Sequence, residues 1–176
     1  ITKTERLVSP LQSIVVADVD GKICLIAPGR VPVRLSSNLI AGRAPVPGWD
    51  ATYQWNGFLE NSALPMIIDP VGGAVATANA NWLPEDYEPL ITYDWTAHFR
   101  QERVDELFVK SNAKQSLETM IAGQSDTLSR ALLALCDEGI LKIEQGVLLN
   151  EEILLALRNW DGQMVGDSPL PLIMTV

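Results

Sequence analysis

The feature that most constrains the fold is a pair of apolar segments separated by an Asp-Gly turn. Residues 13–19 read SIVVADV and residues 22–27 read KICLIA, with Asp20-Gly21 between them. β-Branched side chains favour strands, and Asp-Gly supplies the positive φ that a tight hairpin needs. Both arms are nearly all apolar, which is typical of a sheet covered on both faces. The sequence therefore predicts an antiparallel hairpin within a layered fold.

The remainder of the chain divides into two parts of different character. Most prolines and glycines lie before residue 90, and residues 28–71 alternate these turn formers with isolated aromatic side chains. This segment is predicted to be a long ordered loop region, which in a compact protein usually has a function. A short strand is expected at residues 74–78, after Gly72-Gly73.

The second part, after residue 97, has helical periodicity. Three helices are predicted: one after residue 97 that includes residues 104–108, one from an Asp126-Thr127 cap to near Gly139, and one from an Asn150 cap toward Gly162. Their apolar positions are spaced by three and four residues, namely Val104, Leu107 and Phe108 in the first helix and Leu128, Ala131, Leu132 and Leu135 in the second. The expected class is α+β, with a β-rich segment at residues 1–98 and a helical segment at residues 99–176, which together form a fragment of one larger domain.

Charge and apolar content exclude several classes of partner. The chain has 13 basic and 22 acidic residues and a net charge of -9. This charge disfavours nucleic acid, whose phosphates attract basic surfaces, and anionic membranes. No segment approaches the 18 uncharged apolar residues of a membrane-spanning helix. Cys24 and Cys136 are too far apart for a CxxC site and are predicted to be buried apolar side chains.

Several common catalytic motifs are absent from the sequence. A single histidine, His98, excludes an HExxH zinc site, and neither a GxGxxG nor a GxxxxGK[ST] segment is present. Residues 17–21 resemble part of a calcium loop, but Val16 and Ala27 would occupy its first and last ligand positions. The hairpin interpretation is therefore favoured for residues 17–21. His98, which has no partner in the sequence pattern, is expected to be a partly exposed loop residue.

Five segments in order carry a resemblance to a known family. They read ADVDGKICLIAPGRVPVR, APVPGWDATYQWNGFL, IIDPVGGAVATANANW, YDWTAHFRQERVDEL and RNWDG. In order and spacing this sequence resembles the β subunit of penicillin acylases, which are N-terminal nucleophile hydrolases. The resemblance covers residues 13–108 and returns at residues 159–162. It implies an αββα sandwich with antiparallel strands in the first half, followed by a mostly helical segment.

The resemblance also implies roles for two residues. In this family an N-terminal serine attacks an acyl carbonyl, its α-amino group acts as base, and an asparagine amide binds the oxyanion. The matching asparagine is Asn79, after the segment GAVATA, and the matching arginine is Arg103, in Glu102-Arg103-Val104. Arg103 would orient the nucleophile's amine and the asparagine. From the residues alone, a turn-forming role is favoured for Asn79, and Arg103 is expected to be a solvated helix residue.

The ends of the chain bear on the same expectation. It opens at Ile1 and closes on the apolar run PLPLIMTV, so an internal fragment of the β subunit is expected, with the nucleophile outside it. The expected partners are then the α subunit, the rest of the β subunit and a small acyl-amide substrate, with no nucleic acid or membrane. The family resemblance suggests a periplasmic location.

Cofactors and alternative functions complete the expectations. The reaction implied by the resemblance needs no organic cofactor. The family binds a structural calcium ion, and Glu85, Asp86 and Glu88 form an acidic patch here, but no ligands are assigned. Tyr53 and four other aromatic side chains are candidates for the acyl pocket, namely Trp49, Trp55, Phe58 and Trp82. Two alternatives stay open: a non-catalytic binding domain that retains the fold, and a small α+β protein with only an architectural likeness.

Overall fold

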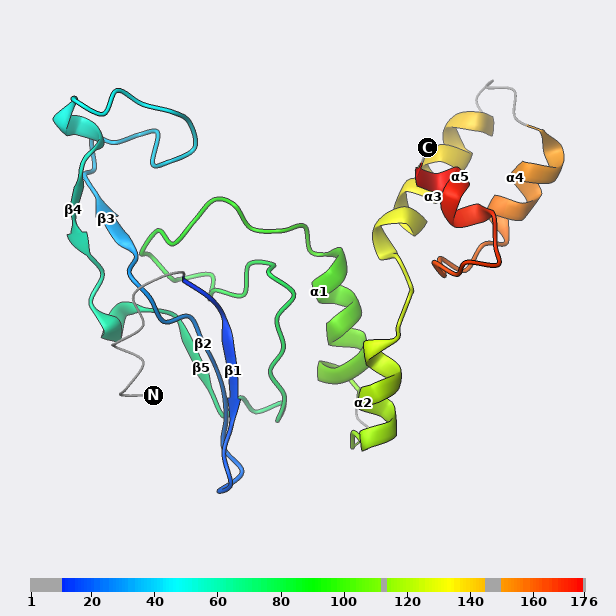
Figure 1. Ribbon diagram of the computed structural model, residues 1–176, viewed down its shortest axis with the longest axis horizontal. Helices are drawn as coiled ribbons and strands as arrows, with labels where there is room; N and C mark the ends of the chain where they lie inside the picture. Colours follow the sequence, from blue (N-terminus) through cyan, green and yellow to red (C-terminus); the bar gives the residue numbers. More distant parts are fainter. Residues whose placement is uncertain (1–10, 112–113, 145–149, 176) are drawn as a thin grey trace. The chain divides into compact units, whose positions relative to one another are not determined.

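The computed structural model describes residues 11–111, 114–144 and 150–175, with the side chains of residues 141–144 left out. The chain forms two compact units, Ile1–Thr96 and Ala97–Val176, each of which is described by itself (Figure 1). The first unit contains antiparallel strands and the second contains helices. The predicted α+β class is therefore confirmed. That both units belong to one larger domain stays a prediction.

A three-stranded antiparallel sheet organises the first unit. Its strands are β1 (Ile14–Ala17), β2 (Ile23–Ile26) and β5 (Met66–Ile68), in the order β1-β2-β5 (Figure 1). The central residue Leu25 lies opposite Val15 on one side and Ile67 on the other. The predicted hairpin is thus confirmed, and β2 is its buried arm.

The turn of this hairpin is built on Asp18 and Gly21. The Asp18 carboxylate accepts hydrogen bonds from the backbone N–H groups of Asp20 and Lys22, both at 2.9 Å. Gly21 has φ +83°, a backbone conformation that residues other than glycine rarely adopt. Because this carboxylate satisfies the turn's own backbone, the structure agrees with the hairpin interpretation over the calcium-loop interpretation.

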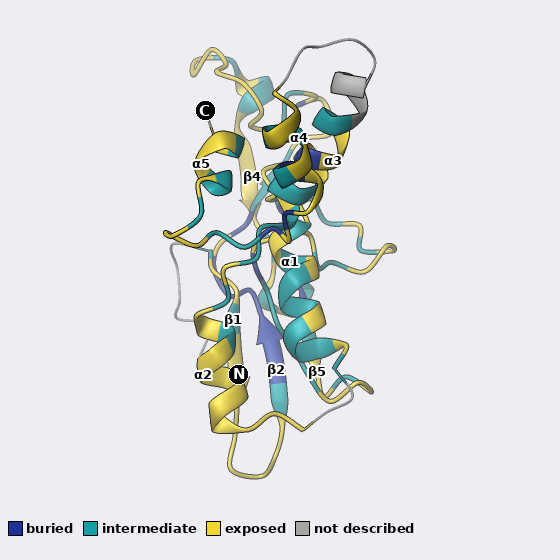
Figure 2. Cartoon of the chain, turned by 90° about the vertical axis from the view of Figure 1, so that its right-hand side faces the viewer, coloured by how far each residue is buried: buried dark blue, intermediate teal, exposed yellow. Residues whose placement is uncertain are grey.

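Burial of the sheet differs from the expectation of two covered faces. Cys24, Leu25 and Ile26 of β2 are buried, whereas most of β1 and β5 is exposed (Figure 2). Within the described part of the chain, only the central strand is therefore covered. A continuous run of apolar side chains does not reveal which faces of a strand are covered, because that depends on the tertiary structure.

The region at residues 28–71 contains more regular structure than the sequence predicts. β3 (Pro32–Arg34) pairs with β4 (Trp55–Phe58). The short 3-10 helix η2 (Ala51–Tyr53) precedes β4, and a second one, η3 (Asn61–Ala63), lies between β4 and β5. The prediction of a strand at residues 74–78 is wrong, since that segment has no strand pairing. Proline and glycine mark turns correctly, but strand pairing depends on partners distant in the sequence.

A small apolar core holds the last third of the first unit. Val31, Leu64 and Ile91 are buried together, and Tyr87 and Trp95 pack against them. The Tyr87 hydroxyl donates a 2.7 Å hydrogen bond to the carbonyl of Ala63, and burial raises the pKa of Tyr87. This cluster anchors the segment that follows Asn79.

The second unit is helical, as predicted, with helices that the sequence did not reveal. Its helices are α1 (Phe99–Val104), a π turn η4 (Asp105–Val109), α2 (Leu117–Gln124), α3 (Arg130–Glu144), α4 (Glu151–Arg158) and α5 (Leu170–Thr175). The first predicted helix corresponds to α1 and η4. The Asn150 cap of α4 is confirmed, because its side chain accepts the N–H of Glu152 at 2.8 Å. α2 and α5 were not predicted.

The predicted bounds of the second helix are wrong at both ends. α3 begins at Arg130 and continues past Gly139 to Glu144. The Ser129 hydroxyl, in place of Asp126, accepts an N–H of the first turn, from Leu132 at 3.3 Å. The Asp126 carboxylate is instead bound to Arg103. The Asp126 carboxylate therefore pairs with an arginine of α1 instead of capping α3, the role that the local sequence predicts.

The core of the second unit lies between α3, α4 and the segment that follows α4. Cys136, Leu157 and Trp160 are buried in contact with each other. Cys24 and Cys136 are both free and buried, as predicted, and burial raises the pKa of Cys136. Among the described residues, no helix has the length and apolar character needed to cross a bilayer.

Candidate active site

Asn79 lies at a constrained point of the backbone in the first unit. Its φ is +69°, the left-handed conformation that asparagine tolerates better than most residues. Thr96 holds the backbone on both sides of this point: its hydroxyl donates to the Ala78 carbonyl and its N–H to the Asn79 carbonyl, both at 3.1 Å. Asn79 thus occupies a turn, as the turn-former interpretation predicts. The residue is exposed to solvent.

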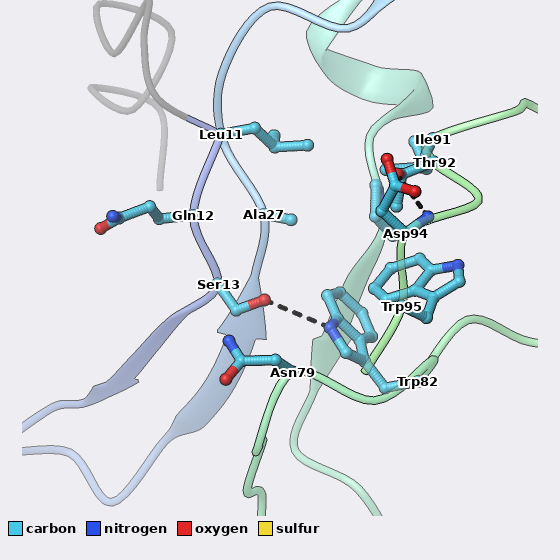
Figure 3. Close-up of a pocket in the computed structure, with 11 residues that line it drawn as sticks. Leu11, Gln12, Ser13, Ala27, Asn79, Trp82, Ile91, Thr92, Asp94 and Trp95 are labelled. Atoms are coloured by element: carbon cyan, nitrogen blue, oxygen red, sulfur yellow. Dashed lines mark hydrogen bonds between the residues drawn. The ribbon is translucent and has the colours of Figure 1, made fainter. Parts of the chain in front are cut away.

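The exposed Asn79 lines a pocket of about 490 Å³ within the first unit (Figure 3). Across the pocket, the Trp82 indole N–H donates a 3.3 Å hydrogen bond to the Ser13 hydroxyl. Figure 3 shows the Asn79 amide beside this pair, on the side of Ser13. Ala27, which follows β2, lines the pocket on the same side as Ser13. The pocket thus joins the sheet to the segment that follows Asn79.

The pocket wall combines apolar side chains with a comparable number of polar ones. Trp82, Ile91 and Trp95 supply apolar wall, and Asp94 is the only ionisable residue among the described residues that line it. The Asp94 N–H donates to the Thr92 hydroxyl at 3.0 Å. A neutral amide such as that of Asn79 can donate a hydrogen bond to a developing oxyanion without adding a buried charge. The pocket therefore offers a ligand both apolar contacts and hydrogen-bonding groups.

Of the five aromatic residues considered for an acyl pocket, only Trp82 lines the pocket that contains Asn79. Trp49 is 88% exposed and Trp55 is 62% exposed. Trp55 and Phe58 pack edge to face with ring centroids 6.0 Å apart, and Arg30 lies over the Phe58 ring. Pocket roles for these residues therefore have no support within this unit.

Arg103 lies at the end of α1 in the second unit, and carboxylates surround its guanidinium. Asp126 accepts from Nε at 2.9 Å and from Nη2 at 2.6 Å, and Glu106 accepts from Nη1 at 3.2 Å. Glu106 also pairs with Arg130. The Arg103 side chain is 24% exposed. The structure thus differs from the expectation of a solvated helix arginine, because this side chain is partly buried and paired with two carboxylates.

The same ion pairs shift the titration of the carboxylates. The hydrogen bond from Arg103 lowers the pKa of Asp126, and the hydrogen bond from Arg130 is the largest cause of the lowered pKa of Glu106. Both carboxylates are therefore charged at neutral pH. Hydrogen bonds to Asp126 likewise raise the pKa of Arg103, which keeps its positive charge at every ordinary pH.

Acid is expected to destabilise the second unit, in part through Asp126. A carboxylate whose pKa is lowered on folding contributes stability that is present above its unfolded pKa of about 3.9 and lost as pH falls through the folded value. In Asp126→Asn, the free energy of unfolding should therefore fall less steeply than in the native chain between about pH 5 and pH 2. Urea unfolding followed by circular dichroism measures this slope.

The exposed residue Asp137 on α3 supplies the matched control for this experiment. Asp137→Asn makes the same chemical change without removing an ion pair that the structure shows. We expect its slope to equal that of the native chain. An equally steep slope in Asp126→Asn would mean that the pair with Arg103 does not contribute to acid sensitivity.

The other sequence candidates form no catalytic cluster. The exposed His98 ring lies 3.5 Å from the Glu102 carboxylate and stacks on Phe99, in agreement with the expectation of a partly exposed residue. Among the described residues, no three His, Cys, Asp or Glu side chains are close enough to hold a metal ion. Glu85, Asp86 and Glu88 therefore do not form a calcium site by themselves.

Three residues of these surroundings were not found by sequence reasoning. Thr96 holds the Asn79 backbone, Ser13 accepts from Trp82, and Asp126 binds Arg103. Their partners lie 18, 69 and 23 residues away along the chain, and no local pattern connects them. Asp126 did give a local signal, the helix cap, which pointed to the wrong role.

Comparison with known proteins identifies the class. The family profile described as penicillin amidase matches residues 1–176. The structure is similar to that of a thermostable penicillin G acylase from Alcaligenes faecalis, with a TM-score of 0.67, 22% identity, and coverage of 95% of this chain and 30% of that chain. The fold is thus shared with a penicillin acylase, and the chain belongs to the penicillin amidase family.

Two curated relatives are named as acylases of different substrates. The penicillin acylase 2 proenzyme of Pseudomonas sp. (strain SE83) is 34% identical over 158 residues, which cover 86% of this chain and 19% of that protein. The acyl-homoserine lactone acylase QuiP of Pseudomonas syringae pv. syringae (strain B728a) is 37% identical over 98 residues, which cover 56% of this chain and 11% of that protein. The chain thus spans about a fifth or less of the length of these relatives.

Proposed function

We propose that this chain is part of an amide hydrolase of the penicillin acylase type. The substrate is a carboxamide of the form R–CO–NH–R′, such as a penicillin, another acyl amide or an acyl-homoserine lactone. The match of the penicillin amidase profile to all 176 residues carries this proposal. The names of the relatives support the same substrate class. The partners would be the remainder of the acylase polypeptide and the substrate.

The proposed reaction proceeds through an acyl-enzyme. The hydroxyl of an N-terminal serine outside this chain adds to the acyl carbon, and its proton passes to the serine's own α-amino group. The C–N bond then breaks, and this proton goes to the leaving amine. Water hydrolyses the resulting ester, which releases the carboxylic acid and restores the serine. No organic cofactor takes part in these steps.

Asn79 and Arg103 have separate roles in this proposal. The Asn79 amide donates a hydrogen bond to the oxyanion of the tetrahedral intermediate, where negative charge develops. Its position in a pocket that Trp82, Ile91 and Trp95 line in part supports this role, because these side chains can contact the acyl group. The Arg103 guanidinium orients the amine of the nucleophile and the asparagine.

The test is a comparison of the complete protein with this chain alone. We expect the product of the complete reading frame to hydrolyse members of a panel of chromogenic N-acyl anilides and acyl-homoserine lactones, and the 176-residue chain to hydrolyse none. A complete protein with its N-terminal nucleophile replaced serves as the control for contaminating activity.

Two results would contradict the proposal in different ways. Hydrolysis by the pure 176-residue chain would contradict a nucleophile outside it. A complete protein that hydrolyses none of the substrates, yet binds one in equilibrium dialysis, would favour the alternative of a non-catalytic binding domain with the acylase fold.

A further inference from the structure

The Asp126 carboxylate binds the Arg103 guanidinium through two hydrogen bonds, in a bidentate geometry. One oxygen accepts from Nε at 2.9 Å and the other from Nη2 at 2.6 Å. Two parallel hydrogen bonds between a planar guanidinium and a planar carboxylate define the orientation of the arginine as well as its position. Of the five N–H donors of Arg103, one more binds Glu106, which leaves two for other groups.

Glu106 is a weaker determinant of the orientation of Arg103 than Asp126. It makes one hydrogen bond to Arg103, at 3.2 Å, and its other oxygen pairs with Arg130. Its side chain is 35% exposed, compared with 17% for Asp126. Water therefore screens the Glu106 contact more strongly.

Asp126 is itself held by a second segment of the same unit. It lies between α2 and α3, where the adjoining residues form a short antiparallel contact with the segment after α4. The Ser129 N–H donates to the Gly162 carbonyl at 2.9 Å, and the Met164 N–H donates to the Thr127 carbonyl at 3.0 Å. The Thr127 hydroxyl donates to the side-chain oxygen of Gln163 at 2.7 Å. These bonds hold the backbone on the C-terminal side of Asp126.

The segment that supplies this contact is the turn at residues 159–162, with the sequence Asn-Trp-Asp-Gly. Trp160 is buried in the core of the unit, and its indole N–H donates to the Gln163 carbonyl at 3.2 Å. Gly162 has φ +81°, and a Cβ at this position would collide with the Leu133 side chain. The conformation of the turn is therefore tightly constrained. Through the Gly162 carbonyl, the turn also binds the segment that carries Asp126.

We propose that Asp126 is a positioning residue that holds the Arg103 guanidinium in its working orientation, and that the turn at residues 159–162 holds the segment that carries Asp126. This inference rests on the proposed role of Arg103 in amide hydrolysis. It gives a function to the RNWDG segment, which has no catalytic role of its own here. The two remaining N–H donors of Arg103 would act on the reacting groups, whereas Asp126 would not touch them.

The experiment is a double-mutant cycle in the complete protein, with an N-acyl anilide that the native protein hydrolyses. We expect Asp126→Asn to lower kcat about tenfold and to change KM less than about twofold, because the neutral amide loses one of the two charge-assisted hydrogen bonds. Asp126→Glu should recover most of the rate. The double variant Asp126→Asn with Arg103→Lys should be no more than about twofold slower than Arg103→Lys alone.

The control is Asp137→Asn on α3, an exposed position where we expect kcat within about twofold of the native value. Thermal unfolding of every variant separates lost folding from lost orientation. Two results together would overturn the inference: Asp126→Asn has a lowered Tm, and the double variant loses kcat by the product of the two single losses. Asp126 would then have a purely structural role.

The remaining outcomes distinguish the inference from the proposed function. If Arg103→Lys slows the reaction while Asp126→Asn equals the control, the inference fails and the role of Arg103 stands. If Arg103→Lys is as fast as the native protein, the role of Arg103 and the inference fail together. If the native complete protein hydrolyses no substrate of the panel, the proposed function fails, and the inference fails with it.

Discussion

Replacing Asn79 by alanine in the complete protein is expected to lower the rate of acylation by about 10²–10³-fold. An oxyanion donor acts where charge develops during the reaction, and removal of one such donor typically has an effect of this size. The Asn79 side chain lines the pocket, and its backbone is held by Thr96 on both sides. Single-turnover measurement of the leaving amine reports the acylation step directly.

Alanine at this position also disturbs the backbone, so a second variant is needed. Asn79 has φ +69°, which alanine tolerates poorly and glycine tolerates well. Asn79→Gly therefore keeps the turn and removes only the amide. We expect Asn79→Gly to lose the rate as Asn79→Ala does, with little loss of stability.

The neighbouring Asn81 supplies the matched control for the amide. Its side chain accepts the N–H of Leu83 at 3.0 Å, in the same loop but outside the lining of the pocket. Asn81→Ala is expected to keep the acylation rate within about threefold. A loss of less than about tenfold in both Asn79 variants would contradict the oxyanion role and leave Asn79 as a turn residue only.

Leu25→Ala is expected to lower the free energy of unfolding of the first unit by about 2–5 kcal/mol, measured by urea unfolding of the 176-residue chain. Leu25 is 1% exposed and lies at the centre of β2, opposite Val15 and Ile67. Truncation removes buried apolar surface and leaves a cavity that the flanking strands cannot fill completely.

The control for this prediction is another leucine in the same unit. Leu39 is 78% exposed, so Leu39→Ala should change the free energy of unfolding by less than about 0.5 kcal/mol. If the two variants are equally stable, β2 is not the centre of the core of this unit. Because Ala27, two residues beyond Leu25, lines the pocket, the same variant should also weaken ligand binding there.

Local patterns predicted the elements whose signals are complete within a few residues. The hairpin at residues 13–27 was found because two β-branched arms flank an Asp-Gly pair, and α4 was found because Asn150 caps an amphipathic segment. The pairing of β3 with β4 was missed, since each strand is short and its partner is about twenty residues away. The strand at residues 74–78 was predicted wrongly, because apolar content does not supply a pairing partner.

The residues of the chain specify the chemistry that is available: a neutral amide at position 79 and a forked cation at position 103. The family resemblance predicts that both groups act in amide hydrolysis, and the penicillin amidase profile matches the chain that carries them. Folding determines how each group is held. Thr96 holds the Asn79 backbone by hydrogen bonds. Asp126 binds Arg103, and the turn at residues 159–162 contacts the segment that carries Asp126. These contacts join residues far apart in the chain, and their geometry arises from the packing of whole elements, which no local pattern encodes.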